Sequence, residues 1–217
     1  MQTWAIIAQK GGQSKTTLAT GFAVEAAREG ASVVILDADD RQGSALYWAD
    51  RRDTEDVTVK DSSIAGLPLH VRRGRDSGKL DLIVIDTPAN SKDIAMLAAE
   101  QADFVIIPVV PRGLDIHSVL QTVKQVQQAG TPFAVILTQV PHQGGEGDEA
   151  AAGFAAKDIA TFGTRLHFRK DYYRATPAGK TAIELDPMSK AANELRAAFN
   201  EAKRLSKYAT KNISEAA

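Results

Sequence analysis

The sequence predicts an α/β protein with a doubly wound, mostly parallel sheet and helices on both of its faces. Five short apolar runs, most of them rich in Val and Ile, are bounded by polar residues or by Gly and Pro. Near-continuous apolar runs are typical of strands that are buried on both faces. Segments of helical character separate the runs, and this alternation implies parallel strands joined by right-handed crossovers. The predicted strands are residues 4–8, 33–36, 82–85, 104–109 and 133–137.

Helices are predicted between these strands. In the first, Leu18, Phe22 and Ala26 recur at four-residue spacing and form one apolar stripe. The predicted helices are residues 16–28, 42–52, 91–101 and 115–128.

Other segments lack so clear a pattern. Residues 53–80 are polar and basic, which predicts a short strand pair or a loop, and the Gly-rich residues 141–148 predict a flexible connection. A helix, a short strand near residues 166–168 and a long helix from 189 to about 211 are expected to follow. Because no repeat or linker divides the chain, residues 1–217 are expected to form a single domain.

Composition excludes several classes of protein. The chain has 217 residues, of which 44% are apolar and 24% charged, the balance of a soluble globular protein. No apolar run approaches the roughly 20 residues of a membrane-spanning helix, and the N-terminus lacks the pattern of a secretory signal. The absence of cysteine excludes disulfides, thiolate metal sites and cysteine nucleophiles. We therefore expect a cytoplasmic protein that does not bind membrane.

Charge is unevenly distributed although the net charge is only −1. Residues 165–211 contain 11 Lys or Arg against 5 Asp or Glu. A basic segment on a nearly neutral protein suggests a face that meets a polyanion. A solvated helix surface explains the same composition equally well.

A glycine-rich segment follows the first predicted strand and precedes a predicted helix. Its glycines allow backbone N–H groups to turn inward on phosphates, and the helix presents its positive end to the same anion. Lys15 would neutralise the β- and γ-phosphates of a nucleotide, and the Thr16 hydroxyl would bind Mg²⁺. An ordinary strand-to-helix turn is the alternative. The segment consists of Lys10, Gly11, Gly12, Gln13, Ser14, Lys15, Thr16 and Thr17.

Aspartates end two of the predicted strands. Asp37 and Asp39 follow the second strand, and Asp86 ends the apolar strand at 82–85. Ligands of open α/β sheets bind at the carboxyl ends of the strands, which is where these carboxylates are expected. An apolar strand that ends in Asp and follows such a loop predicts that Asp86 holds Mg²⁺ through water. Capping of a helix is the alternative for Asp39 and for Asp40.

The loop resembles the deviant Walker A loop of the ParA/MinD family of ATPases, which reads K-G-G-x-x-K-T. The resemblance implies that Lys10 reaches across a nucleotide-sandwich dimer to the partner's phosphates. It also implies that Asp39 positions the attacking water and that Asp37 lies near the magnesium. Two departures stand out. Ser14 replaces the usual Gly, and Asp40-Arg41 replace a single Pro, an apparent one-residue insertion.

The resemblance covers essentially the whole chain. Within the family, the chain is similar to the small, ParF-like plasmid partition ATPases. It implies ATP and Mg²⁺ as ligands, ATP-dependent dimerisation or higher polymerisation, and slow, switch-like hydrolysis. It also implies non-specific DNA binding, hence association with the nucleoid, and a centromere-binding or adaptor partner that stimulates hydrolysis. The basic residues that we expect at the DNA are Arg169, Lys180, Lys190, Arg196, Lys203, Arg204 and Lys207.

Two other functions remain open from the sequence. One is an ATP-dependent small-molecule ligase or synthetase of the same fold, against which Lys10 argues because such enzymes usually lack this lysine. The other is a non-hydrolysing nucleotide-sensing module, which Ser14 and the Asp40-Arg41 insertion favour.

Overall fold

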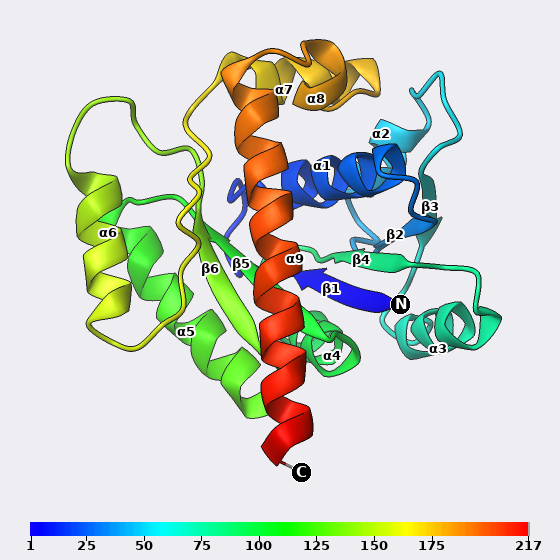
Figure 1. Cartoon of the computed structure of the whole chain (residues 1–217), viewed down its shortest axis with the longest axis horizontal. Helices are drawn as coiled ribbons and strands as arrows, with labels where there is room; N and C mark the ends of the chain where they lie inside the picture. The colour runs from blue at the N-terminus through cyan, green and yellow to red at the C-terminus, as the bar shows by residue number, and fades with distance from the viewer. Residues whose placement is uncertain (217) are drawn as a thin grey trace.

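A computed structural model describes residues 1–216 and, within them, every side chain except those of residues 113–118 and 208–216. In this part of the chain a six-stranded sheet runs in the order β3-β2-β4-β1-β5-β6, and all of its strand pairs are parallel. Helices cover both faces (Figure 1), so the predicted fold class is confirmed. The strands are β1 Gln2–Ile6, β2 Val33–Asp37, β3 Thr58–Asp61, β4 Leu82–Asp86, β5 Phe104–Val109 and β6 Phe133–Leu137.

The helices alternate with the strands up to β6 and then continue alone. The first group is α1 Lys15–Arg28, α2 Ser44–Ala49, α3 Leu67–Ser77, α4 Lys92–Gln101 and α5 Gly113–Ala129. The second is α6 Glu146–Ala155, α7 Lys170–Ala175, the 3₁₀ turn η1 Thr176–Ala178, α8 Ala182–Leu185 and α9 Lys190–Ala216. None of the helices in the described residues is long and apolar enough to cross a membrane.

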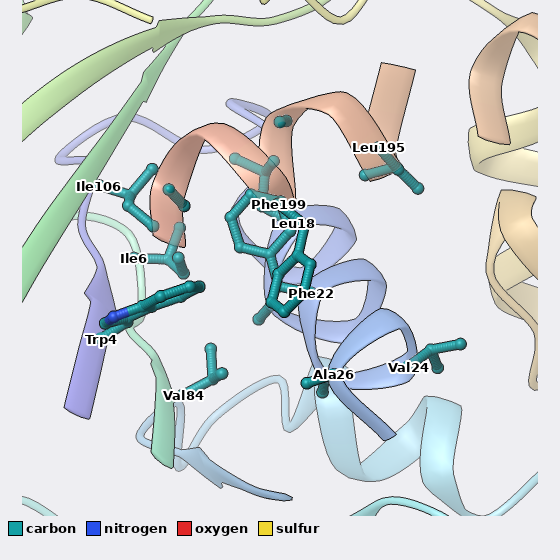
Figure 2. Close-up of a cluster of buried hydrophobic side chains, with 14 of the residues drawn as sticks. Trp4, Ile6, Leu18, Phe22, Val24, Ala26, Val84, Ile106, Leu195 and Phe199 are labelled. Atoms are coloured by element: carbon teal, nitrogen blue, oxygen red, sulfur yellow. The ribbon is translucent and has the colours of Figure 1, made fainter. Parts of the chain in front are cut away.

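Two separate apolar cores explain why the strands contain so few polar residues. One face of the sheet packs against α1, α2, α8 and α9, and the opposite face packs against α3, α4, α5 and α6. In the first core the rings of Trp4, Phe22 and Phe199 lie 5.8–6.1 Å apart, which joins β1, α1 and α9 (Figure 2). Gly21 permits this packing, since a Cβ there would come within 2.9 Å of Leu195.

The prediction for residues 53–80 was wrong. The segment forms the edge strand β3 and the eleven-residue helix α3, which buries Leu67 and Val71. Gly74 lies inside this helix because a Cβ there would come within 2.7 Å of Ile83 on β4. The helix therefore packs through a missing side chain, a signal that an apolar pattern does not contain.

The predicted strand near residues 166–168 is reduced to an isolated bridge between Val140 and His167. The helices α7 and α8, which precede the long helix α9, were not predicted. They place the segment 170–185 beside α2, where Trp48 donates its indole N–H to the carbonyl of Lys180 at 3.0 Å. Arg52 adds a bidentate ion pair with Glu184, and this contact fixes the end of α2.

Candidate nucleotide-binding site

The glycine-rich loop lies between β1 and α1, at the carboxyl edge of the sheet. Gly12 has φ 73° and Ser14, the N-cap of α1, has φ 68° and ψ 26°. Both are left-handed conformations, which glycine adopts without strain and other residues rarely adopt. The backbone at position 14 therefore favours Gly, the residue that the resemblance implied there, and this chain accommodates Ser instead.

Lys15 begins α1 and is only 9% exposed. Burial lowers the pKa of its ammonium group, while the charges of Asp86 and Asp39 oppose that shift. A buried ammonium beside two carboxylates can neutralise an incoming anion at little further cost in desolvation.

Asp86 is the most perturbed carboxylate at this edge. Burial, foremost, and the nearby charge of Asp37 raise its pKa to about 7, against a hydrogen bond from Thr16 and the charge of Lys15. Thr16 Oγ1 donates to Asp86 Oδ2 at 2.7 Å, whereas the buried Oδ1 has no hydrogen-bond partner. An unpartnered carboxylate oxygen next to a hydroxyl fits a divalent cation, and Mg²⁺ on nucleotide phosphates typically uses one or two protein ligands.

Asp37 lies beside Asp86, with which it is aligned across β2 and β4. Its carboxylate accepts backbone N–H groups from Asp39 at 3.1 Å, Ala45 at 2.9 Å and Leu46 at 3.0 Å. Burial raises the pKa of Asp37, and these three hydrogen bonds oppose the rise. Asp37 therefore neighbours the expected cation position, while its Oδ2 anchors the start of α2 and its Oδ1 binds the backbone of the turn before it.

Asp39 lines a hollow of about 220 Å³ formed over the loop. Its Oδ1 accepts the backbone N–H groups of Arg41 at 3.2 Å and Gln42 at 3.0 Å, so it also stabilises the local turn. The hollow contains most of the predicted site residues together with four that were not predicted as site residues, Gln42, Ser44, Thr87 and Ala89. Its lining is Gly11, Gly12, Gln13, Ser14, Lys15, Thr16, Thr17, Asp39, Gln42, Ser44, Asp86, Thr87 and Ala89. Lys10 is exposed and is not among these lining residues.

A second hollow of about 300 Å³ adjoins the loop at Ser14 and Thr17. Its wall is mostly aromatic and apolar, and Phe168 and Tyr173 contribute rings 6.1 Å apart. The largely apolar lining of this space suits a nucleoside base beside bound phosphates. This hollow was not predicted from the sequence, because its wall is assembled from distant segments: the loop, the residue Gln139 after β6, and residues 166–177.

The basic residues expected at DNA fall into two groups. Three are at most half-exposed and form ion pairs with other segments: Arg169 with Glu194 at 2.6 Å, Arg196 with Glu25 at 3.7 Å, and Lys203 with Glu29 at 2.7 Å. Glu194 also accepts hydrogen bonds from His167 and Tyr172. Burial would raise the pKa of Glu194, but these hydrogen bonds and the one from Arg169 lower it overall. The other four side chains are exposed: Lys180, Lys190, Arg204 and Lys207. Among them, Arg204 forms a long contact of 4.0 Å with Glu201 of its own helix.

Comparison with known proteins agrees with this geometry. The CobQ/CobB/MinD/ParA nucleotide binding domain matches residues 4–205. "Maintenance of carboxysome distribution protein A" from Gloeobacter kilaueensis is 33% identical over 184 residues, which cover 83% of each chain. The septum site-determining protein MinD from Pyrococcus horikoshii, complexed with Mg-ADP, superposes with a TM-score of 0.79 at 18% identity, covering 96% of this chain and 98% of that chain. An ATP complex of a Cyanothece McdA variant superposes with a TM-score of 0.71 at 18% identity, covering 94% and 96%.

Proposed function

The chain belongs to the CobQ/CobB/MinD/ParA nucleotide-binding family, and we propose that it is an ATP-hydrolysing switch that positions a cargo along DNA. One observation carries the nucleotide part of this proposal. The buried Lys15 and the Thr16–Asp86 pair face the same hollow, and one oxygen of Asp86 has no hydrogen-bond partner.

In this proposal the β- and γ-phosphates lie over the loop, against Lys15 and the amino end of α1. Thr16 and Asp86 hold Mg²⁺, directly or through water, and the base occupies the hollow beside Phe168 and Tyr173. Bound Mg²⁺ supplies charge neutralisation on the phosphate oxygens. Relatives of the same fold have been seen with Mg-ADP and with ATP.

Asp39 is the residue that we assign to orienting the attacking water. It lines the phosphate hollow, and its backbone belongs to the turn that Asp37 anchors to β2. Because Asp39 already stabilises this turn through Arg41 and Gln42, its free oxygen would have a fixed direction. A fixed general base or water-positioning group typically contributes about 10²–10⁴-fold to a rate.

Lys10 is assigned to the partner copy of an ATP-bound dimer. It is exposed at the start of the loop, while Lys15 serves the phosphates of its own subunit. The position of Lys10 outside the phosphate hollow of its own subunit is explained if Lys10 contacts the nucleotide of a facing copy.

The cargo and the DNA contacts are the parts that rest most on relatives. The 33% identity with a carboxysome distribution protein favours a carboxysome-like body as the cargo. The alternative, which the sequence analysis suggested, is a plasmid that is linked to this ATPase by a centromere-binding protein. The exposed Lys180, Lys190, Arg204 and Lys207 are the proposed contacts to DNA phosphates, and an adaptor that bridges to the cargo would stimulate hydrolysis. ATP-bound copies would then reside on the nucleoid.

Light scattering and phosphate release test the switch together. The wild type should dimerise with ATP and remain monomeric with ADP, and its slow phosphate release should depend on Asp39. Lys10→Ala should bind ATP as a monomer, whereas Asp39→Ala should form a long-lived ATP dimer that turns over at least about 10²-fold more slowly. A wild type that stays monomeric in ATP would remove the dimer from the proposal. ATP binding without turnover would favour the nucleotide-sensing module, and turnover by a monomer would favour a small-molecule ligase or synthetase.

A further inference from the structure

The ends of β5 and β6 hold the outer side of the phosphate loop. Gln139 donates its Nε2 to the carbonyl of Gly12 at 2.6 Å, and the buried hydroxyl of Thr138 donates to the carbonyl of Gln13 at 3.3 Å. The side chain of Gln13 points back the other way and accepts the N–H of Val110 at 2.7 Å. Two successive carbonyls of the loop are therefore bonded by two successive residues that follow β6.

These bonds determine where the loop's amides point. In a planar trans peptide the C=O and N–H groups face in opposite directions. A bond that draws the carbonyl of Gly12 outward therefore aims the N–H of Gln13 inward, and the bond to the carbonyl of Gln13 does the same for the N–H of Ser14. The inward side is the hollow that all three loop residues line. Backbone N–H groups turned into such a concavity are what binds phosphate.

Strained backbone gathers at the same place. The described residues contain four non-glycine residues with positive φ, and three of them touch or belong to the loop. Ser14 has φ 68° and Gln139 φ 49°, and their side chains meet where Gln139 Nε2 donates to Ser14 Oγ at 3.2 Å. Asn90, with φ 57°, donates its N–H to the carbonyl of Gln9 at 2.7 Å. Such conformations persist where the surroundings hold them, and they cluster at functional sites.

We propose that Thr138 and Gln139 are positioning residues for the nucleotide phosphates. Through the two carbonyls they orient the amides of Gln13 and Ser14, and Gln139 also holds Ser14 in the left-handed conformation that glycine would adopt without support. The inference rests on the nucleotide site of the proposed function, and it is independent of the dimer, the DNA and the cargo.

The test measures binding of Mg²⁺-ADP and, by competition, of Mg²⁺-pyrophosphate, which has phosphates but no base. Gln139→Ala removes both side-chain hydrogen bonds and should weaken both ligands about 3- to 10-fold. Thr138→Val should weaken both about 2- to 5-fold. Gln139→Gly should lose as much affinity as Gln139→Ala while unfolding at a higher urea concentration, because Gly adopts the positive φ without strain.

Asp158→Gly is the matched control, since Asp158 has φ 53° and is not among the residues that line the phosphate hollow. It should change the unfolding midpoint without changing either affinity. Three outcomes would overturn the inference. In the first, Gln139→Ala would bind both ligands like the wild type, and in the second it would lose affinity for ADP alone. In the third outcome, Gln139→Gly would regain affinity for both ligands together with its higher unfolding midpoint. A wild type that binds no Mg²⁺-ADP would instead overturn the nucleotide site itself.

Discussion

Asp86→Asn should stabilise the nucleotide-free protein at high pH. The carboxylate is 2% exposed, and its burial is the main reason that its pKa lies near 7 instead of 3.8. Asparagine has nearly the same shape, keeps an oxygen that can accept the Thr16 hydroxyl, and cannot ionise. The substitution therefore removes the cost of a buried charge and leaves most of the local packing in place.

The sign and size of the effect follow from proton linkage. Because the pKa is raised in the folded state, the protonated carboxyl stabilises the fold fully below pH 4, and that contribution is lost as the pH rises through 7. Each pKa unit corresponds to about 1.4 kcal/mol, so the full shift is worth at most about 4 kcal/mol. Between pH 5 and pH 8 the advantage of Asn over Asp in unfolding free energy should grow by about 3 kcal/mol.

Urea unfolding of both proteins at pH 5 and pH 8, without nucleotide or Mg²⁺, measures this difference. Asp76→Asn, at an exposed carboxylate on α3, is the control and should behave alike at both pH values. Calorimetry adds an independent check, since Mg²⁺-ADP binding at pH 7 should release about half a proton from Asp86 in the wild type and none in Asp86→Asn. An Asn variant that gains no stability at pH 8 relative to pH 5 would refute the assignment of Asp86 as a desolvated carboxylate.

Three further predictions test other parts of the structure. Lys15→Ala should weaken ATP binding by about 2–5 kcal/mol in calorimetry, because the phosphates lose their buried countercharge, and unchanged affinity would contradict the loop assignment. Gly179→Ala should lower the urea unfolding free energy by more than about 2 kcal/mol, since its Cβ would overlap the backbone that follows α2. Gly78→Ala, which has a similar φ and open space around the Cβ, should cost only about 1 kcal/mol, and equal losses would argue against the overlap. Replacing Arg204 and Lys207 by Gln should flatten the salt dependence of DNA binding by about 0.9 in log–log slope for each lost phosphate contact, and an unchanged slope would show a merely solvated face.

The sequence alone determined the fold class, five of the six strands and the position of the glycine-rich loop. Strands buried on both faces have no polar side, so their apolar runs were visible without any knowledge of their neighbours. The loop was visible because phosphate binding restricts residue types over a short stretch, from Lys10 to Thr17. Asp86 was found for the same reason, as the end of an apolar strand.

Only the tertiary structure decided what depends on contacts between distant segments. Helix α3 was missed because it buries only Leu67, Val71 and Gly74, so most of its sequence is polar and basic. Asp37 carries two tasks that its sequence motif cannot separate, since its carboxylate binds the first amides of α2 while lying beside Asp86. Gln139 meets the loop from 125 residues away, and nothing in its local sequence marks that contact. Short-range patterns predict which elements form, whereas packing decides which distant side chains complete the site.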